Sequence, residues 1–279
     1  MTDLIANLSV HQSLGRRPTQ QDRYVACRVR DGVLLGVFDG HGPRGDLVAE
    51  RAALAAPKLV CDLLAERHTP EMALRLVIQQ LIALCRDGGA DVLDPDSDRS
   101  AGGSTVTLAY VAEGVATVAV LGDSPALVAT TTEVLIAPEH CVEDDEVAIQ
   151  RLDTLPETVR RGLVVQGGYL NRHWSSLALT RALGDPDFAD VLYLEPDVRS
   201  YRLTAGDALV VASDAIRVSD DPEIKLEHYR DLALRARTQS ADTLAADLIA
   251  QRNPSDNLTL LVCQMREAAL PRRVAASLW

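Results

Sequence analysis

The sequence predicts an α+β fold in which sheets and helices form separate layers. Short apolar runs typical of strands come in clusters, and amphipathic stretches typical of helices come in pairs, without the regular alternation of βαβ units. Neighbouring strands are joined by turns too short for a parallel crossover, which needs about a dozen residues. The 279 residues are 47% hydrophobic and 24% charged, a composition typical of a globular protein with a sizeable core. We therefore expect antiparallel strand pairs in a layered sandwich.

The first predicted elements are two strands followed by two helices. Tyr24–Val29 and Val33–Phe38 are apolar runs on either side of an Arg-Asp-Gly turn, which is a hairpin signal. Apolar residues at helical spacing predict a helix over Asp46–Arg67. A second helix is expected over Pro70–Arg86, where the proline suits the first turn. Asp87–Gly103 is rich in glycine, aspartate and serine and is expected to be an exposed loop.

The rest of the chain repeats this grouping of strands and helices. Strands are expected over Thr105–Val111, Val115–Leu121, Ala126–Ala129, Val198–Leu203, Ala208–Ala212 and Leu258–Gln264, and helices over Glu143–Leu155, His228–Arg237 and Ala241–Arg252. The stretch from the end of the acidic helix to His173 is predicted to be irregular. Since no repeat or low-complexity linker divides the chain, we expect one domain over residues 1–266. Residues 267–279 form a C-terminal tail without a recognisable partner.

Composition and charge argue against several functional classes. With 28 Lys and Arg against 40 Asp and Glu, the net charge of −12 leaves no basic surplus to displace counterions from DNA or RNA. No apolar run approaches the ~20 residues of a membrane span, and the N-terminal segment does not resemble a signal peptide. The five cysteines include no CxxC pair and are expected to be free thiols in a reducing compartment. We expect a cytoplasmic monomer that binds neither nucleic acid nor membrane.

Four aspartates lie next to predicted strands, namely Asp39, Asp123, Asp214 and Asp256. One such aspartate is usually a turn residue, but four could meet at one edge of the sheets. Carboxylates 4 Å apart repel by roughly 4 kcal/mol at an effective dielectric of 20, so a cluster needs cations. Oxygen ligands suit Mg²⁺ or Mn²⁺, and two such ions can activate water and hold a phosphoryl group. Calcium storage is the alternative, although the chain contains no DxDxDG loop.

Residues near the first of these aspartates suit phosphate chemistry. Arg16 and Arg17 precede the first predicted strand, and a guanidinium group matches a phosphate bidentately. His41 is either a plain turn residue or, beside a metal cluster, a general acid for an alkoxide leaving group. Gly40 lets the backbone approach a cation closely, so its carbonyl oxygen is a further candidate ligand.

Six sequence segments carry a family resemblance. They are VFDGHG (37–42), GGST (102–105), LGDS (121–124), LTRALGD (179–185), ASDA (212–215) and SDNLTLLV (255–262). This ordered series resembles the motifs of the metal-dependent protein phosphatases, the PPM or type 2C serine/threonine phosphatases. RPTQQD (17–22) is similar to the opening motif of that family. The resemblance spans about Arg17 to Val262 and implies a four-layer αββα sandwich, with two antiparallel β-sheets flanked by helices.

The resemblance also implies a metal centre of two Mn²⁺ or Mg²⁺ ions. Asp39 would bridge both ions, and the Gly40 carbonyl would bind the first. Asp214 and Asp256 would bind the second ion. Asp123 matches an aspartate that, together with the equivalent of Asp214, holds a weaker third ion in family members.

Further roles follow from the same resemblance. Arg17 would bind phosphate, His41 would be the general acid, and Asp22 would orient metal-bound water. Gln21 replaces the glutamate of the family pattern and can still bond such a water through its carbonyl. Ala215 replaces a glycine, and a positive φ at that position would strain alanine by about 1 kcal/mol.

We therefore predict a phosphatase that hydrolyses phosphoserine or phosphothreonine in proteins, with a metal-bound hydroxide attacking phosphorus directly. The alternative is a pseudophosphatase, a phosphoprotein-binding or regulatory module with the same fold but without efficient turnover. Ala215 and Gln21 are the only sequence support for that alternative. A metal-dependent nuclease would use similar ions but conflicts with the net charge of −12.

Overall fold

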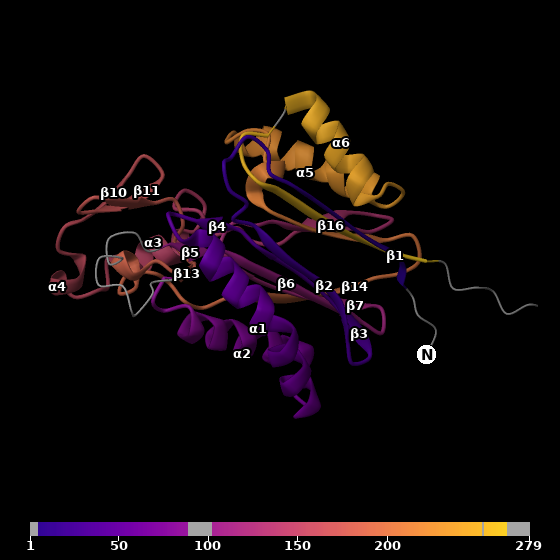
Figure 1. Cartoon of the computed structure of the whole chain (residues 1–279), viewed down its shortest axis with the longest axis horizontal. Coiled ribbons are helices and arrows are strands. Elements are labelled where there is room, and N and C mark those ends of the chain that lie inside the picture. Colours follow the sequence, from indigo (N-terminus) through magenta and orange to yellow (C-terminus); the bar gives the residue numbers. More distant parts are fainter. Residues whose placement is uncertain (1–4, 89–101, 253, 267–279) are drawn as a thin grey trace, which may run out of the picture.

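Two five-stranded sheets packed face to face form the centre of the molecule, as the computed structural model shows (Figure 1). The structure describes residues 5–88, 102–252 and 254–266. The predicted C-terminal tail and most of the predicted loop Asp87–Gly103 lie outside the described residues. All strand pairs in both sheets are antiparallel. A helix pair covers the outer face of each sheet, so the predicted αββα sandwich is confirmed.

The first sheet has the strand order β14-β7-β6-β3-β2. Its strands are β2 (Arg23–Val29), β3 (Gly32–Phe38), β6 (Val106–Ala112), β7 (Val115–Leu121) and β14 (Asp197–Arg202). The covering helices are α1 (Gly45–Ala65) and α2 (Pro70–Leu84). The start of α2 follows its sequence signals, because the Thr69 side chain accepts a hydrogen bond from the Met72 amide and Pro70 occupies the first turn.

The second sheet has the order β1-β16-β15-β8-β9. Its strands are β1 (Ile5–Ser13), β8 (Ala126–Ala129), β9 (Val134–Ile136), β15 (Ala208–Ala212) and β16 (Leu258–Met265). Helices α5 (Pro222–Ala236) and α6 (Ala241–Arg252) cover its outer face. Two of these strands, β1 and β9, are absent from the sequence prediction, and α5 begins six residues before its predicted start.

Period-two alternation in the buried strands explains the layers. In β3, Leu35 and Val37 point into the core between the sheets, whereas Leu34 and Phe38 pack toward α1 and α2. In β15, Val211 faces the first sheet and its neighbour Val210 faces α5 and α6. Both strands are apolar on both faces because each lies between a sheet and a helix layer.

A separate unit lies to one side of the sandwich (Figure 1, left). It contains α3 (Glu146–Leu152), α4 (Glu157–Arg160) and a three-stranded sheet of β10 (Leu163–Gln166), β11 (Tyr169–Arg172) and β12 (Ser175–Leu177). Leu170, Leu177 and Phe188 belong to its own apolar cluster. The prediction of an irregular stretch up to His173 is therefore wrong. These strands are three or four residues long and mostly not fully buried, so no alternation marks them in the sequence.

The smallest sheet connects the sandwich to this side unit. It pairs β4 (Gly40–His41) with β5 (Gly103–Ser104), and β5 with β13 (Leu183–Gly184). Three of the family-like motifs thereby lie side by side. All five cysteines are described and free, as predicted, and three of them are buried. Among the described helices, none combines the length and the apolar character that a membrane crossing requires.

Candidate active site

The four predicted aspartates meet at one end of the two sheets. Asp39 follows β3, Asp123 follows β7, and Asp214 opens the short 3₁₀ helix η3 (Asp214–Ile216) after β15. Asp256 precedes β16 by two residues. Burial raises the pKa of Asp39 well above its ordinary value, and the charges of these three carboxylates and of Asp22 raise it further. Five carboxylates from distant parts of the chain thus lie within electrostatic reach of one another.

Asp22 lies beneath this cluster and is 1% exposed. Its Oδ2 accepts a hydrogen bond from the Thr259 hydroxyl at 2.7 Å, whereas its Oδ1 is buried without a hydrogen-bond partner in the described residues. Burial raises the pKa of Asp22 to about 6, although the bond from Thr259 lowers it. For Asp214, burial and the charge of Asp123 raise the pKa to about 7. The raised pKa values of Asp22 and Asp214 indicate that the positive side chains nearby do not balance the negative charge of the cluster.

The donor chemistry of the cluster fits Mg²⁺ or Mn²⁺. Carboxylate oxygens are hard ligands, and a buried oxygen without a partner is suited to a water molecule or an ion. Within the described ranges, however, no group of three or more Asp, Glu, His or Cys side chains forms a ready-made metal site. The aspartates therefore lie near one another, but their side chains are not yet arranged around one metal position. Gly40 lies beside them in β4, and a β-carbon there would approach the Gly45 carbonyl oxygen to 2.4 Å.

Arg17 lies at the rim of the cluster and forms an ion pair with Asp256. Its side chain is 54% exposed, so much of the guanidinium faces solvent. The loop that carries Arg17 is fixed by Asn257, whose Oδ1 accepts from the Gln21 amide at 2.7 Å and whose Nδ2 donates to the Leu14 carbonyl at 2.9 Å. The Gln21 side chain donates to the Gly42 carbonyl at 2.8 Å, which leaves its carbonyl end for a water molecule.

His41 is paired with Asp185, whose Oδ2 lies 2.8 Å from His41 Nε2. Burial lowers the pKa of His41, but the charge and hydrogen bond of Asp185 outweigh burial and raise it above its ordinary value. Gly103 in β5 makes room for this pair. A β-carbon on Gly103 would lie 2.1 Å from Asp185 Oδ2 and 2.4 Å from His41 Nε2.

Arg217 brings a second guanidinium group to the cluster. Its Nη2 lies 3.4 Å from Asp123 Oδ2 and 3.5 Å from Cys141 Sγ. Arg217 follows η3, and its backbone amide donates to the Asp214 carbonyl at 2.7 Å. A cavity of about 370 Å³ next to the cluster is lined by Arg16, Asp214, Ala215, Arg217, Asp220, Leu248, Pro254, Ser255 and Asp256.

Ala215 does not carry the strain that the sequence suggested. It lies inside η3 and is not among the described non-glycine residues with a positive φ. The short helix presents Asp214 with ordinary right-handed backbone geometry. The expected cost of about 1 kcal/mol at this position is therefore absent.

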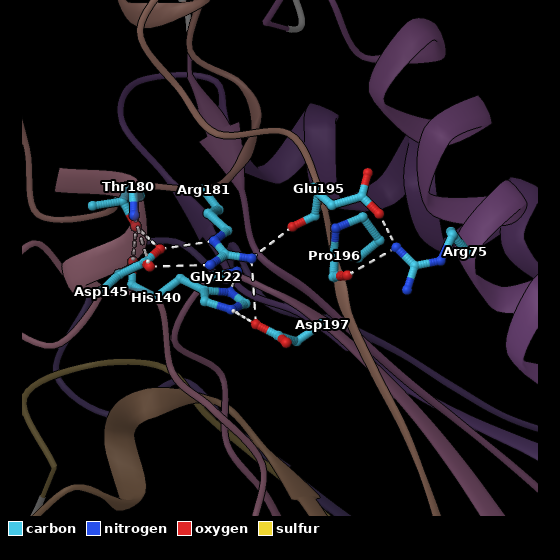
Figure 2. Close-up of polar contacts among 10 residues, drawn as sticks. Arg75, Gly122, His140, Asp145, Thr180, Arg181, Glu195, Pro196 and Asp197 are labelled. Atoms are coloured by element: carbon cyan, nitrogen blue, oxygen red, sulfur yellow. Dashed lines mark hydrogen bonds and ion pairs between the residues drawn. The ribbon is translucent and has the colours of Figure 1, made fainter. Parts of the chain in front are cut away.

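A buried polar network connects the side unit to the Asp123 loop (Figure 2). The His140 amide donates to the Gly122 carbonyl at 2.9 Å, and the Gly122 amide donates to His140 Nδ1 at 3.1 Å. Because Nδ1 accepts, the ring proton lies on Nε2, which donates to Asp197 at 2.9 Å. His140 thereby holds both backbone groups of the residue that precedes Asp123.

Sequence reasoning missed the residues that position the predicted ones. Asp185 ends the LTRALGD motif, and Asn257 follows Asp256 in SDNLTLLV, so both were visible in motifs but had no assigned role. Arg217 stands three residues after Asp214 in a segment without a strong pattern. No local signal identifies it, because its partner Asp123 is 94 residues away.

Comparisons with known proteins point to one family. The sequence profile described as Protein phosphatase 2C matches residues 22–217. A curated relative from Oryza sativa subsp. japonica, named probable protein phosphatase 2C 69, is 27% identical over 239 residues, which cover 82% of this chain and 54% of the relative. Probable protein phosphatase 2C 3 of Paramecium tetraurelia is 24% identical, covering 91% of this chain and 90% of its own. The chain spans about half the length of the two rice relatives, 54% and 49%.

Solved structures show the same fold. A C. elegans sex determining protein superposes with a TM-score of 0.71 at 22% identity, covering 94% of this chain and 65% of its own. The PPM Ser-Thr phosphatase MsPP of Mycobacterium smegmatis, in complex with cacodylate, superposes at 0.60 with 23% identity, covering 94% and 99%. The catalytic domain of PstP, with two manganese ions, superposes at 0.58 with 19% identity and the same coverage.

Proposed function

Because the chain belongs to the protein phosphatase 2C family, we propose that it is a metal-dependent phosphatase of phosphoserine and phosphothreonine in proteins. The observation that carries this proposal is the meeting of Asp22, Asp39, Asp123, Asp214 and Asp256, whose charges affect one another. Such a cluster needs divalent cations, and the PstP structure with two manganese ions agrees with that need.

The residues that we propose would hold two Mn²⁺ or Mg²⁺ ions are Asp39, Gly40, Asp214 and Asp256. When bound, such ions lower the pKa of water and stabilise the negative charge that develops on a transferring phosphoryl group. Asp22 is suited to orient the attacking water, since its buried Oδ1 has no partner in the described chain. Gln21 offers a carbonyl oxygen for the same water.

Arg17 and His41 act on the phosphate and on the leaving group in this proposal. Arg17 has an exposed guanidinium at the rim of the cluster, where it can hold two phosphate oxygens. His41 donates a proton to the departing serine or threonine oxygen, so that an alcohol leaves instead of an alkoxide. Because Nε2 is held by Asp185, Nδ1 is the nitrogen that carries this proton.

The first test is hydrolysis of p-nitrophenyl phosphate and of a phosphothreonine peptide with Mn²⁺. We expect activity in the wild type and a loss of more than about 100-fold in kcat/KM for Asp39→Asn and Asp214→Asn, since even outer-shell changes at metal sites cost about 10–100-fold. Asp231→Asn on the exposed face of α5 is the matched control and should retain full activity. Full activity in Asp39→Asn or Asp214→Asn would refute the proposal.

The pseudophosphatase alternative retains little support. Its first argument, strain at Ala215, does not apply to the backbone geometry of η3. Its second argument, Gln21, is weakened because the side chain is oriented by the Gly42 carbonyl and keeps an acceptor oxygen. The alternative predicts Mn²⁺ binding without phosphate release, or no Mn²⁺ binding, so calorimetry combined with a phosphate assay distinguishes the two functions.

A further inference from the structure

Arg217 places a positively charged side chain within the carboxylate cluster. Asp123 is only 8% exposed, and Arg217 Nη2 lies 3.4 Å from its Oδ2. Cys141 Sγ lies 3.9 Å from the same carboxylate oxygen and 3.5 Å from the same guanidinium nitrogen. The approach to Asp123 Oδ2 is therefore already occupied by a positive group and a thiol.

The position of Arg217 is fixed from two directions. Its backbone amide donates to the Asp214 carbonyl, which ties it to a proposed metal ligand. On the other side, Glu139 Oε1 lies 3.8 Å from Arg217 Nη2. Glu139 in turn binds Lys225 Nζ at 2.9 Å and accepts from the Tyr229 hydroxyl at 2.9 Å. Lys225 is shared between Glu139 and Asp144, and Arg217 lies closer to Asp123 than to Glu139.

The guanidinium of Arg217 stands where a further cation would approach Asp123. A divalent ion on Asp123 Oδ2 would stand next to the guanidinium and be repelled by it. Binding there would require Arg217 to leave a largely buried position and to abandon a desolvated ion pair.

We propose that Arg217 takes the place of a third divalent ion at Asp123, so that the centre of this chain binds two ions and not three. This inference rests on the proposed function, because it concerns the same metal centre. Asp123 then acts as the anchor of Arg217, and Asp39, Asp214 and Asp256 remain the carboxylates available to metal.

The test counts bound Mn²⁺ by equilibrium dialysis, with the free ion measured by electron paramagnetic resonance. We expect two ions on the wild type up to millimolar Mn²⁺, and a third, weaker ion on Arg217→Gln. Arg217→Lys keeps a cation and should bind two. Asp123→Asn should leave the count at two in the wild-type background and should remove the third ion from Arg217→Gln.

The counts of bound Mn²⁺ test the two-ion inference separately from the proposed phosphatase function. Three ions on the wild type, or an unchanged count of two on a folded Arg217→Gln, would overturn the inference and leave the phosphatase proposal intact. No Mn²⁺ on the wild type would overturn both. If Arg217→Gln does not fold, Asp123→Asn decides, because loss of an ion from this variant would mean that Asp123 is a metal ligand after all.

Discussion

Single residues at the site act through partners that lie far away in the sequence. Asp39 and Asp214 are recognisable because each follows an apolar strand in a motif. Asp185 binds His41 over 144 residues, and only the packing of β4, β5 and β13 brings the two together. The sequence therefore predicts the reactive groups at the site but not the residues that hold them. Their roles in metal binding and proton transfer remain predictions.

The His41–Asp185 pair leads to a prediction on the leaving group. Asp185→Asn should lower kcat for a phosphothreonine peptide by about 10-fold or more, because an alkoxide needs a correctly held general acid. Hydrolysis of p-nitrophenyl phosphate should change much less, since p-nitrophenolate leaves without protonation. The ratio of the two kcat values is the measurement.

Two variants make this test specific. Asp187→Asn changes a nearby aspartate that bonds to Ser175 at 2.5 Å and should leave the ratio unchanged. Gly103→Ala should change the ratio in the same direction as Asp185→Asn, because its methyl group would collide with both members of the pair. Equal losses with both substrates in Asp185→Asn would mean that Asp185 has only a structural role.

At the scale of helices and strands, the prediction of an element from the sequence was accurate where the element is buried and its apolar residues form a clear pattern. Strands with continuous apolar runs, such as β7 and β15, were predicted with correct bounds. The strand β1 was missed because no residue of Ile5–Ser13 is fully buried. The first two turns of α5 contain no buried residue, and their apolar residues Ile224 and Leu226 are exposed. Only the capping pair Asp221-Pro222 therefore marks its true start.

The side unit is attached to the sandwich by buried polar contacts (Figure 2). Asp145 caps α3 by accepting from the Ala148 amide at 3.1 Å, and it accepts two hydrogen bonds from Arg181, at 2.7 and 3.0 Å. Arg181 also donates to the Glu195 carbonyl at 2.7 Å and stacks 4.6 Å from the Tyr193 ring centre. One guanidinium thus joins α3 to the chain that leads into β14.

This network predicts a pH-dependent loss of stability in Asp145→Asn. Burial raises the pKa of Asp145, but the hydrogen bonds from Arg181 and Thr180 outweigh it and hold the pKa below its ordinary value. A depressed pKa stabilises the fold above the unfolded-state value of about 3.9, and this stabilisation disappears as pH falls below it. Near pH 7 the variant should lose about 3 kcal/mol, because the buried Arg181 would lose its two hydrogen bonds to a carboxylate and keep only Asp197, at 3.3 Å, as a counter-charge.

Urea unfolding of the wild type and the variant between pH 3 and 7 measures this difference. The gap should be constant from pH 7 to about 5 and should shrink toward pH 3. Asp144→Asn is the control, since Asp144 is 42% exposed in its pair with Lys225 and should cost less than about 1 kcal/mol. A gap that does not depend on pH would show that the charge of Asp145 is not the cause.

At the scale of the whole molecule, the sandwich itself brings the acidic groups together. Asp39 and Asp123 come from one sheet, whereas Asp214 and Asp256 come from the other. Continuous apolar runs predict strands that are buried on both faces, but they do not fix which strand ends meet across the core. The motif resemblance supplied the αββα arrangement, and the strand order confirmed it. Periodicity alone could not have selected it.

This convergence predicts that divalent ions stabilise the fold. The chain carries a net charge of −12, and five carboxylates meet where the two sheets end, so the ion-free protein loses stability to repulsion. Mn²⁺ at 100 times its Kd should add about 2.7 kcal/mol for each site. For a domain of this size each kcal/mol corresponds to about 2–4 °C in Tm, so one filled site should raise Tm by about 5–10 °C.

Calorimetric Tm values with Mn²⁺ and with NaCl of equal ionic strength separate specific binding from general screening. NaCl should give a much smaller rise, because it screens the net charge without bridging carboxylates. Asp39→Asn should lose most of the Mn²⁺ effect, and it should have a higher Tm than the wild type without metal because one repulsive charge is gone. Asp231→Asn, which also removes one negative charge but from the surface of α5, should keep the full Mn²⁺ effect. An equal Mn²⁺ response in all three proteins would mean that the ions act on the net charge and not on the cluster where the two sheets meet.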